Sequence, residues 1–307
     1  MSCYSIGVVG AGRVGAVLSA ALREAGHDVV AAVGRSAASR TRIETLLPGV
    51  PVTTAREAAR ACDLLLLSVP DDDLPTLVDE LVASGSIRAD HVVVHTSGRH
   101  GTAVLAPAAA LGTKVLALHP AMTFTGTDVD LARIPGCVFG LTGDDSVRSI
   151  GEQLVADLEG FVAWLPERLR PLYHAALAHS ANHLVTLVVQ AMEMLRATGA
   201  PDPAATLRPL LSAALDNALT YENAALTGPV VRGDRSTVAA HLHALLLDAP
   251  SATVDAYLAM ARATVDHSVT DGRLSRERAR EIIGLLDAAV WDATAAAMSQ
   301  RPTAPGR

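Results

Sequence analysis

Three glycines near the start of the chain have the type and the spacing to bind a phosphate. Gly10, Gly12 and Gly15 follow a short apolar segment in the order G-x-G-x-x-G. In a strand–turn–helix unit the first permits a tight turn, the second admits a pyrophosphate and the third lets the helix pack closely. A helix from about Arg13, with Val14 in its first turn, would direct free N–H groups at that anion. The alternative is a glycine turn that serves packing only.

The end of the second predicted strand indicates which dinucleotide this turn would bind. NAD-binding units carry an acid about 20 residues beyond the glycines, where it accepts a hydrogen bond from the ribose. This chain has Gly34, Arg35 and Ser36 there instead. A missing acid removes repulsion of a 2′-phosphate, and arginine offers a planar fork to phosphate oxygens. The sequence therefore predicts NADP(H), with Arg35 and Ser36 on the 2′-phosphate, unless these residues merely solvate the following helix.

Polar residues also follow three later strands. Val69, Pro70 and Asp71 end an apolar run, where they would touch the cofactor, although the acids at this point favour capping of the next helix. Ser97 and His119 follow the next two strands. Because open α/β sheets bind ligands at the carboxyl ends of their strands, we expect Ser97 and His119 to line a substrate site.

Two further groups lie in the second half of the chain. His174 and Asn182 fall about 80° apart on one face of a predicted helix, and histidine is suited to proton transfer near neutral pH. A later turn carries Thr227, Arg232 and Asp234. There Arg232 would hold a substrate carboxylate, or Asp234 would simply cap the next helix.

One histidine pair has the spacing of metal ligands. His179 and His183 are four residues apart, but the acid of an H-E-x-x-H motif is missing between them. We therefore expect no metal, and interpret the two as a packed or surface pair.

The elements that must position these residues alternate between strand and helix in the first half. Apolar runs of strand length predict about eight strands in a mostly parallel, doubly wound sheet of the Rossmann type. They cover residues 6–9, 28–33, 50–52, 63–69, 91–96, 115–118, 136–142 and 161–165. The intervening helices are expected at 13–25, 36–47, 54–62, 74–83 and 145–159.

The second half has only helical periodicity. Helices are predicted at about 169–198, 203–226, 235–247, 253–267 and 275–298. We expect an NADP-binding domain over 1–166, an all-α substrate and dimerisation domain over 167–300, and a disordered tail over 301–307. The many alanines permit close helix packing and suggest a homodimer through the helical domain.

Composition excludes several classes of partner. The net charge of −7 argues against a nucleic-acid surface, and no apolar run approaches the roughly 18 residues of a membrane span. The first residues lack an export signal, so we expect a cytoplasmic protein. Lys114 is the only lysine in the chain.

Longer motifs resemble a known family. HPAMTF at 119–124, YHAALAHSANHL at 173–184 and ALTGPVVRGDRSTVAAHL at 225–242 resemble a bacterial family of proposed Rossmann-like oxidoreductases with a C-terminal domain of unknown function 2520. The resemblance spans nearly the whole chain. It implies kinship with 6-phosphogluconate dehydrogenase, ketopantoate reductase and pyrroline-5-carboxylate reductase, in which an NADP domain precedes a helical, often dimer-forming domain. It implies no particular substrate.

One departure limits the analogy. The first two relatives use a lysine one turn before an asparagine that Asn182 matches, but Ala178 occupies the lysine position here. Arg170 stands where the family often has a basic residue, yet arginine cannot release a proton near neutral pH. His174 is left as the candidate proton donor.

These observations predict an NADP-dependent oxidoreductase that moves a hydride between the nicotinamide and a small carbonyl or imine compound with an acid group. His174 would transfer the proton, Asn182 orient the carbonyl and Arg232 bind the carboxylate. Ketopantoate is the first substrate to test. The alternative is a regulator or scaffold that binds NADPH without turnover.

Overall fold

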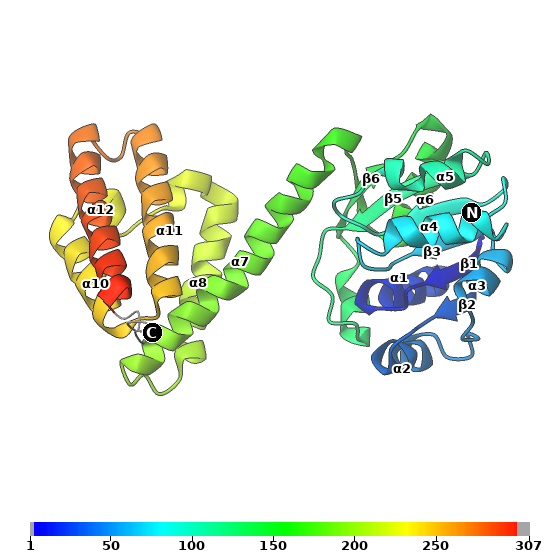
Figure 1. Ribbon diagram of the computed structural model, residues 1–307, viewed down its shortest axis with the longest axis horizontal. Helices are drawn as coiled ribbons and strands as arrows, with labels where there is room; N and C mark the ends of the chain where they lie inside the picture. Colours follow the sequence, from blue (N-terminus) through cyan, green and yellow to red (C-terminus); the bar gives the residue numbers. More distant parts are fainter. Residues whose placement is uncertain (1–2, 300–307) are drawn as a thin grey trace, which may run out of the picture. The chain divides into compact units, whose positions relative to one another are not determined.

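The computed structural model describes residues 3–299, so the predicted tail over 301–307 lies outside the described residues. Seven strands form one sheet in the order β2-β1-β3-β4-β5-β6-β7. Its strands are β1 (Ser5–Val9), β2 (Asp28–Val33), β3 (Leu64–Leu67), β4 (Val92–His95), β5 (Lys114–Pro120), β6 (Val138–Thr142) and β7 (Phe161–Trp164). The predicted Rossmann-type fold is confirmed (Figure 1).

One expected strand is absent from the sheet. Residues 50–52 were expected to form an eighth strand, but they make only an isolated bridge between Ala32 and Val52. Pro51 has no N–H to donate, so the segment cannot extend a ladder. In addition, β5 and β6 pair in an antiparallel manner, whereas β1 to β5 are mutually parallel.

Successive residues of each strand point to opposite faces of the sheet, and helices cover both faces to form two cores. Leu64 and Leu66 of β3 pack in the core that includes α1 (Arg13–Glu24), α2 (Ala37–Leu46) and α6 (Arg148–Asp157). Leu65 and Leu67 pack in the other. The second core includes α3 (Ala55–Arg60), α4 (Leu74–Ala83) and α5 (Ala106–Ala109). Burial on both faces explains the continuous apolar run of this strand.

Short 3-10 turns complete this part of the chain. They are η1 (Thr102–Leu105), η2 (Asp128–Arg133), η3 (Asp145–Val147) and η4 (Glu167–Leu169). The sequence pattern gave no sign of η1, α5 or η2, since segments of four to six residues are too short to show helical periodicity.

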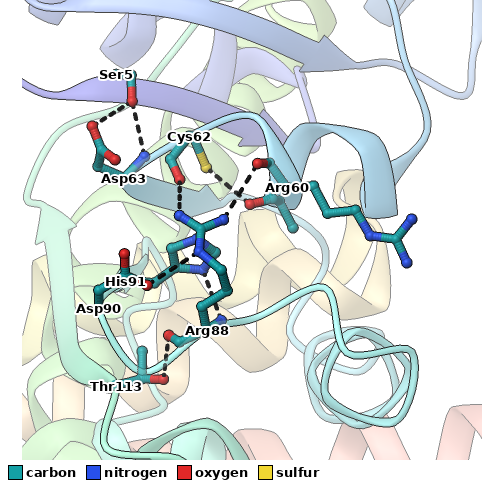
Figure 2. A network of polar contacts seen from close by, with 9 residues as sticks. Ser5, Arg60, Cys62, Asp63, Arg88, Asp90, His91 and Thr113 are labelled. Carbon is teal, nitrogen blue, oxygen red and sulfur yellow. Dashed lines mark hydrogen bonds and ion pairs between the residues drawn. The ribbon is translucent and has the colours of Figure 1, made fainter.

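A network of polar contacts links the amino ends of several strands (Figure 2). This edge of the sheet is opposite the one that carries the glycine turn. The Ser5 hydroxyl donates to Asp63 Oδ2 at 2.6 Å, and Arg88 Nη1 donates to the Arg60 carbonyl at 3.3 Å. Arg88 also donates its backbone N–H to His91 Nδ1 at 3.2 Å. These bonds join the first residue of β1 and the segments that precede β3 and β4, so the network has a structural role.

The chain divides into two compact units between Asn182 and His183, within the long helix α7 (Arg170–Ala197). The sheet ends at Trp164, two residues before the predicted domain boundary at residue 166, and that boundary stays a prediction. The second unit contains α8 (Pro203–Tyr221), η5 (Glu222–Ala225), α9 (Pro229–Arg232), α10 (Arg235–Asp248), α11 (Ser251–Thr270) and α12 (Arg276–Ser299).

Helices α10, α11 and α12 form the core of the second unit, with Leu242, Leu258 and Leu286 among its buried side chains. Helix α8 ends earlier than the predicted 226 because Glu222 adopts a φ of 50°, which a right-handed helix cannot contain. Within residues 3–299, every helix is too short or too polar to serve as a membrane span.

Candidate functional site

The glycine turn has the geometry expected of a dinucleotide site. Gly10 has a φ of +96°, and the N–H groups of Gly10 and Ala11 donate to the Val33 carbonyl at 3.2 and 2.9 Å. A Cβ on Gly15 would overlap the Gly10 carbonyl and lie 2.9 Å from the Ser68 Cβ. Gly12 is the N-cap of α1 and no side chain caps it. The first turn of α1 therefore offers N–H groups to an anion.

A cavity of about 720 Å³ opens at this turn. Its volume falls in the range of about 300–1,000 Å³ that is typical of ligand pockets. The lining comes from the ends of β1, β2 and β3 and from α4. It comprises Val9, Gly10, Ala11, Gly12, Val33, Gly34, Arg35, Ser36, Ser39, Thr53, Thr54, Ala55, Ser68, Val69, Pro70, Asp73, Thr76, Leu77 and Glu80.

Most of the predicted cofactor residues line this cavity, and four do not. The lining lacks Arg13, Val14 and Gly15, which belong to the first turn of α1 behind it. It also lacks Asp71, and Asp73 contributes an acid instead. Which of these residues bind a nucleotide stays a prediction.

Arg35 is held over the cavity by an acid. Its Nη2 lies 2.9 Å from Asp73 Oδ2, with the two side chains 79% and 50% exposed. Exposed pairs of this kind contribute about 0–1 kcal/mol, so a phosphate can displace the carboxylate. The Ser36 hydroxyl accepts from the Ser39 N–H at 3.1 Å and thereby caps α2, so it already has a structural role.

The alternative that the acids after β3 cap α4 is wrong. Asp73 is the N-cap residue of α4, but its side chain makes no capping hydrogen bond. Asp71 and Asp72 pair with Arg99, at 3.4 and 2.7 Å. These acids bind arginines from neighbouring loops instead of the helix backbone.

Next to the cavity, β4, β5 and α7 bring together a polar cluster. His119 Nδ1 lies 3.0 Å from the Tyr173 hydroxyl, and the His119 and His174 rings are 6.0 Å apart. A Cβ on Gly98 would lie 2.8 Å from His174 Cδ2 and 2.9 Å from His119 Nε2. The glycine after Ser97 therefore permits the close approach of two imidazoles. We call His95, Ser97, Gly98, His119, Tyr173 and His174 the histidine cluster.

The histidine cluster and the cavity share one edge of the sheet. The Thr96 hydroxyl donates to the Ser68 hydroxyl at 3.0 Å, and Ser68 lines the cavity. Thr96 directly precedes Ser97 of the cluster. The predicted pair of Ser97 and His119 is thus brought together at the carboxyl ends of β4 and β5, with His174 beside it.

His95 was missed by the sequence analysis, although a histidine that ends the apolar strand VVVH was a visible signal. It accepts from the Ser97 N–H through Nδ1 at 3.1 Å, so Nε2 carries the proton donated to the Gly101 carbonyl at 2.8 Å. Burial lowers the pKa of His95 to about 4. A neutral His95 therefore fixes the loop that presents Ser97 and Gly98.

Two charged residues, Arg170 and Glu167, bind loops at the histidine cluster. Burial, followed by the charges of Arg170 and His174, lowers the pKa of His119 to about 4. Arg170 is fully buried and donates to the Ser97 carbonyl at 2.7 Å. Glu167 accepts from the Thr102 N–H at 2.8 Å and caps η1. The sequence excludes Arg170 as a proton donor and predicts no other role for it.

The remaining predicted residues lie outside this cluster. Asn182 is exposed on α7, two turns beyond His174, and Thr227 and Arg232 are exposed in the second unit. Asp234 caps α10 by accepting from the Thr237 N–H at 3.1 Å and the Thr237 hydroxyl at 2.7 Å. The capping role for Asp234 is therefore observed. Convergence of these residues on the cluster stays a prediction.

Across the described residues, no group of three or more His, Cys, Asp or Glu side chains is arranged to hold a metal ion. His179 and His183 are both exposed on α7.

The lowered histidine pKa values predict that folding stability falls in mild acid. An unfolded histidine binds a proton below about pH 6.5, whereas folded His95 and His119 stay neutral down to about pH 4. Stability is therefore complete above pH 6.5 and decreases as the pH falls from 6.5 towards 4. Urea unfolding between pH 7.5 and 4.5 should show a loss of about 1–3 kcal/mol for each histidine. A His119→Gln variant should show a smaller loss, and equal pH dependence in both proteins would contradict the assignment.

Two family models match separate parts of the chain. Residues 1–120 match the family model of a Rossmann-like domain, and residues 137–264 match that of the domain of unknown function DUF2520. No curated protein matches the sequence.

Solved structures share the fold. A proposed NADP oxidoreductase of Bacteroides fragilis aligns with a TM-score of 0.73 at 22% identity, over 85% of this chain and 98% of the other. An imine reductase of Myxococcus stipitatus in complex with NADP⁺ aligns with a TM-score of 0.58 at 18% identity, over 94% of both chains. A pyrroline-5-carboxylate reductase of Coxiella burnetii gives 0.53 at 16% identity, over 96% and 98%.

Proposed function

We propose that this chain, in which a Rossmann-like domain precedes a DUF2520 domain, is an NADP(H)-dependent oxidoreductase. Its substrate would be a small carbonyl or imine compound with a carboxylate. The observation that carries the proposal is the cavity at the glycine turn, which has Arg35 at its rim and the histidine cluster at the same sheet edge. Structural neighbours that bind NADP⁺ support it.

The residues at the turn fit a dinucleotide. At the Cβ position of Gly12 the nearest atom is the Gly10 carbonyl oxygen, 4.0 Å away, so the backbone there is open to a pyrophosphate. The uncapped first turn of α1 would offer it N–H groups. Arg35 and Ser36 would hold the 2′-phosphate, with Val69 and Pro70 against the adjoining ribose. When bound, NADPH supplies the hydride.

The chain's own side chains would bind the substrate and move the proton. His174 would donate the proton to the substrate oxygen, while Ser97 and His119 line the sheet side. Asn182 would orient the carbonyl and Arg232 would bind the carboxylate, with Thr227 nearby in sequence. A 2-oxo acid related to ketopantoate is the first substrate to test.

Arg35→Asp is expected to weaken NADPH binding at least tenfold while NADH binding changes little. A charge-assisted hydrogen bond contributes about 1.5–3 kcal/mol, and the introduced acid also repels the 2′-phosphate. Parallel titrations that follow nucleotide fluorescence measure both constants. Arg168→Asp makes the same charge change at an exposed arginine outside the cavity, and should leave both unchanged. Equal NADPH affinity in wild type and Arg35→Asp would refute the assignment.

A second candidate function is a protein that senses NADPH without oxidising it. The observation that favours it is Ala178 at the position of the relatives' lysine, on the helix that carries His174. Addition of 2-oxo acids and cyclic imines to the NADPH complex separates the two. Loss of NADPH absorbance supports the oxidoreductase, and tight binding without turnover supports the sensor.

A homodimer through the helical unit remains part of the proposal. Large apolar side chains are exposed on α7 and α8, among them Val185 at 63%, Leu210 at 63% and Leu219 at 77%. Contiguous exposed patches of apolar side chains commonly mark association surfaces. Light scattering should give twice the mass of one chain, and Leu219→Glu should shift it towards the monomer. The expected cytoplasmic location also stays a prediction.

A further inference from the structure

We propose that Arg170 is a fixed buried charge that makes the site prefer a carbonyl substrate over a positively charged iminium. This inference rests on the proposed oxidoreductase function and narrows its substrate class. The structural neighbours include an imine reductase, so the inference separates the substrate class of this chain from that of a protein with a similar fold.

The Arg170 guanidinium is buried among neutral groups. It is 0% exposed, and Nη1 donates to the Gly140 carbonyl at 3.3 Å and to Thr142 Oγ1 at 3.1 Å. Nη2 donates to the Ser97 carbonyl, and Nε has no hydrogen-bond partner. Two carbonyls and a hydroxyl satisfy donors but do not cancel a charge. A buried cation without a carboxylate partner is unusual, since buried charges are normally paired.

The acids that act on Arg170 are engaged elsewhere. Glu167 binds the backbone N–H groups of Thr102 and Ala103, at 2.8 and 3.2 Å. Asp71 lies 3.4 Å from Arg99. Within residues 3–290, no carboxylate lies within ion-pair distance of Arg170. Glu167 and Asp71 therefore oppose the charge of Arg170 only from beyond ion-pair distance, and no ion pair neutralises it.

Arg170 is hydrogen-bonded to the loop that carries the histidine cluster. The Ser97 carbonyl to which it donates belongs to the loop that also carries Gly98 against His119 and His174. The charge of Arg170 contributes to the low pKa values of His119 and His95 and opposes the rise in the Tyr173 pKa. Both histidines are neutral near pH 7, so they add no positive charge to that of Arg170.

The charge changes of the two reactions are opposite. In carbonyl reduction a hydride bonds to carbon, the C=O π pair moves to oxygen, and the developing oxyanion takes a proton from His174 while the nicotinamide becomes NADP⁺. In iminium reduction the hydride bonds to carbon and the π pair neutralises the cationic nitrogen, with no proton needed. A fixed positive charge stabilises the developing oxyanion and disfavours binding of the iminium.

The first test compares substrate classes on the wild-type protein. NADPH oxidation is followed with 2-oxo acids of three to six carbons and with 2-methyl-1-pyrroline, each at pH 7. We expect kcat/KM to be at least tenfold higher for the best 2-oxo acid. Faster turnover of the cyclic imine would overturn the inference but leave the oxidoreductase standing. No turnover of either class would remove the proposed function and this inference with it.

The second test varies the charge. Arg170→Met should lower the carbonyl-to-imine ratio of kcat/KM at least tenfold and raise the His119 pKa measured by NMR of the ring protons. Arg170→Lys keeps the charge and should preserve both, as should Arg168→Met at an exposed neighbour. An unchanged ratio and pKa in a folded Arg170→Met would overturn the inference.

A binding measurement covers the case in which Arg170→Met does not fold. Oxamate, an anion that resembles a 2-oxo acid, and pyrrolidinium, a cation that resembles a reduced imine, are titrated into the wild-type NADP⁺ complex. We expect oxamate to bind at least tenfold more tightly. Tighter binding of pyrrolidinium would contradict a positively charged site.

Discussion

His174→Ala is expected to lower kcat about 10²- to 10⁴-fold, the range typical of a lost general acid. His174 contacts the loop at Gly98 and lies 6.0 Å, ring to ring, from His119, so it reaches the sheet edge where the cavity opens. Its imidazole is the group there proposed to deliver a proton to the substrate oxygen. Single-turnover oxidation of NADPH with the best substrate measures the loss.

A matched control separates this role from damage to the helix. His179→Ala removes an exposed histidine from the same helix and should keep wild-type turnover. The competing donor is Tyr173, whose hydroxyl lies 3.0 Å from His119 Nδ1. If His174→Ala keeps full turnover and Tyr173→Phe loses it, then Tyr173 is the proton donor and the role given to His174 is wrong.

Gly15→Val is expected to weaken NADPH binding at least 100-fold and to destabilise the fold by about 1–3 kcal/mol. A Cβ at Gly15 overlaps the Gly10 carbonyl and comes within 2.9 Å of Ser68, so α1 must move away from the turn. That movement displaces the N–H groups proposed to bind the pyrophosphate. Nucleotide titration and urea unfolding measure the two effects.

Gly284→Ala is the control for this substitution. Gly284 lies within α12, and a Cβ there meets nothing within 4 Å. Since alanine favours a helix over glycine by about 1 kcal/mol, the control should be neutral or stabilising. If Gly15→Val folds and binds NADPH like the wild type, the glycine turn is not the nucleotide site.

The sequence predicted the parts of the fold that depend on local pattern. The spacing of Gly10, Gly12 and Gly15 predicted a strand, turn and helix because each glycine has a steric task. The run over 63–69 predicted a buried strand because both of its faces are covered, and β3 lies within it. Helix α4 has the predicted bounds of 74 and 83.

What the sequence could not provide depends on contacts between distant segments. The pairing of Ala32 with Val52 and the antiparallel direction of β6 are set by neighbouring strands, which periodicity does not reveal. The burial of Arg170 arises because Ser97 and Gly140, 73 and 30 residues away, supply its acceptors. Ser97 and His119 were predicted because both follow parallel strands, and His95 was missed because it lies inside one.

Lys114 begins β5 and is exposed, at the end of the strand opposite His119 and the candidate site. As the only lysine, it gives amine-directed reagents one side chain to acylate in the whole chain. A surface or a fluorophore attached there would leave the carboxyl edge of the sheet open to solvent. Attachment through Lys114 therefore directs the cavity away from the surface, and nucleotide binding can be followed by a label at Lys114 that does not obstruct the cavity.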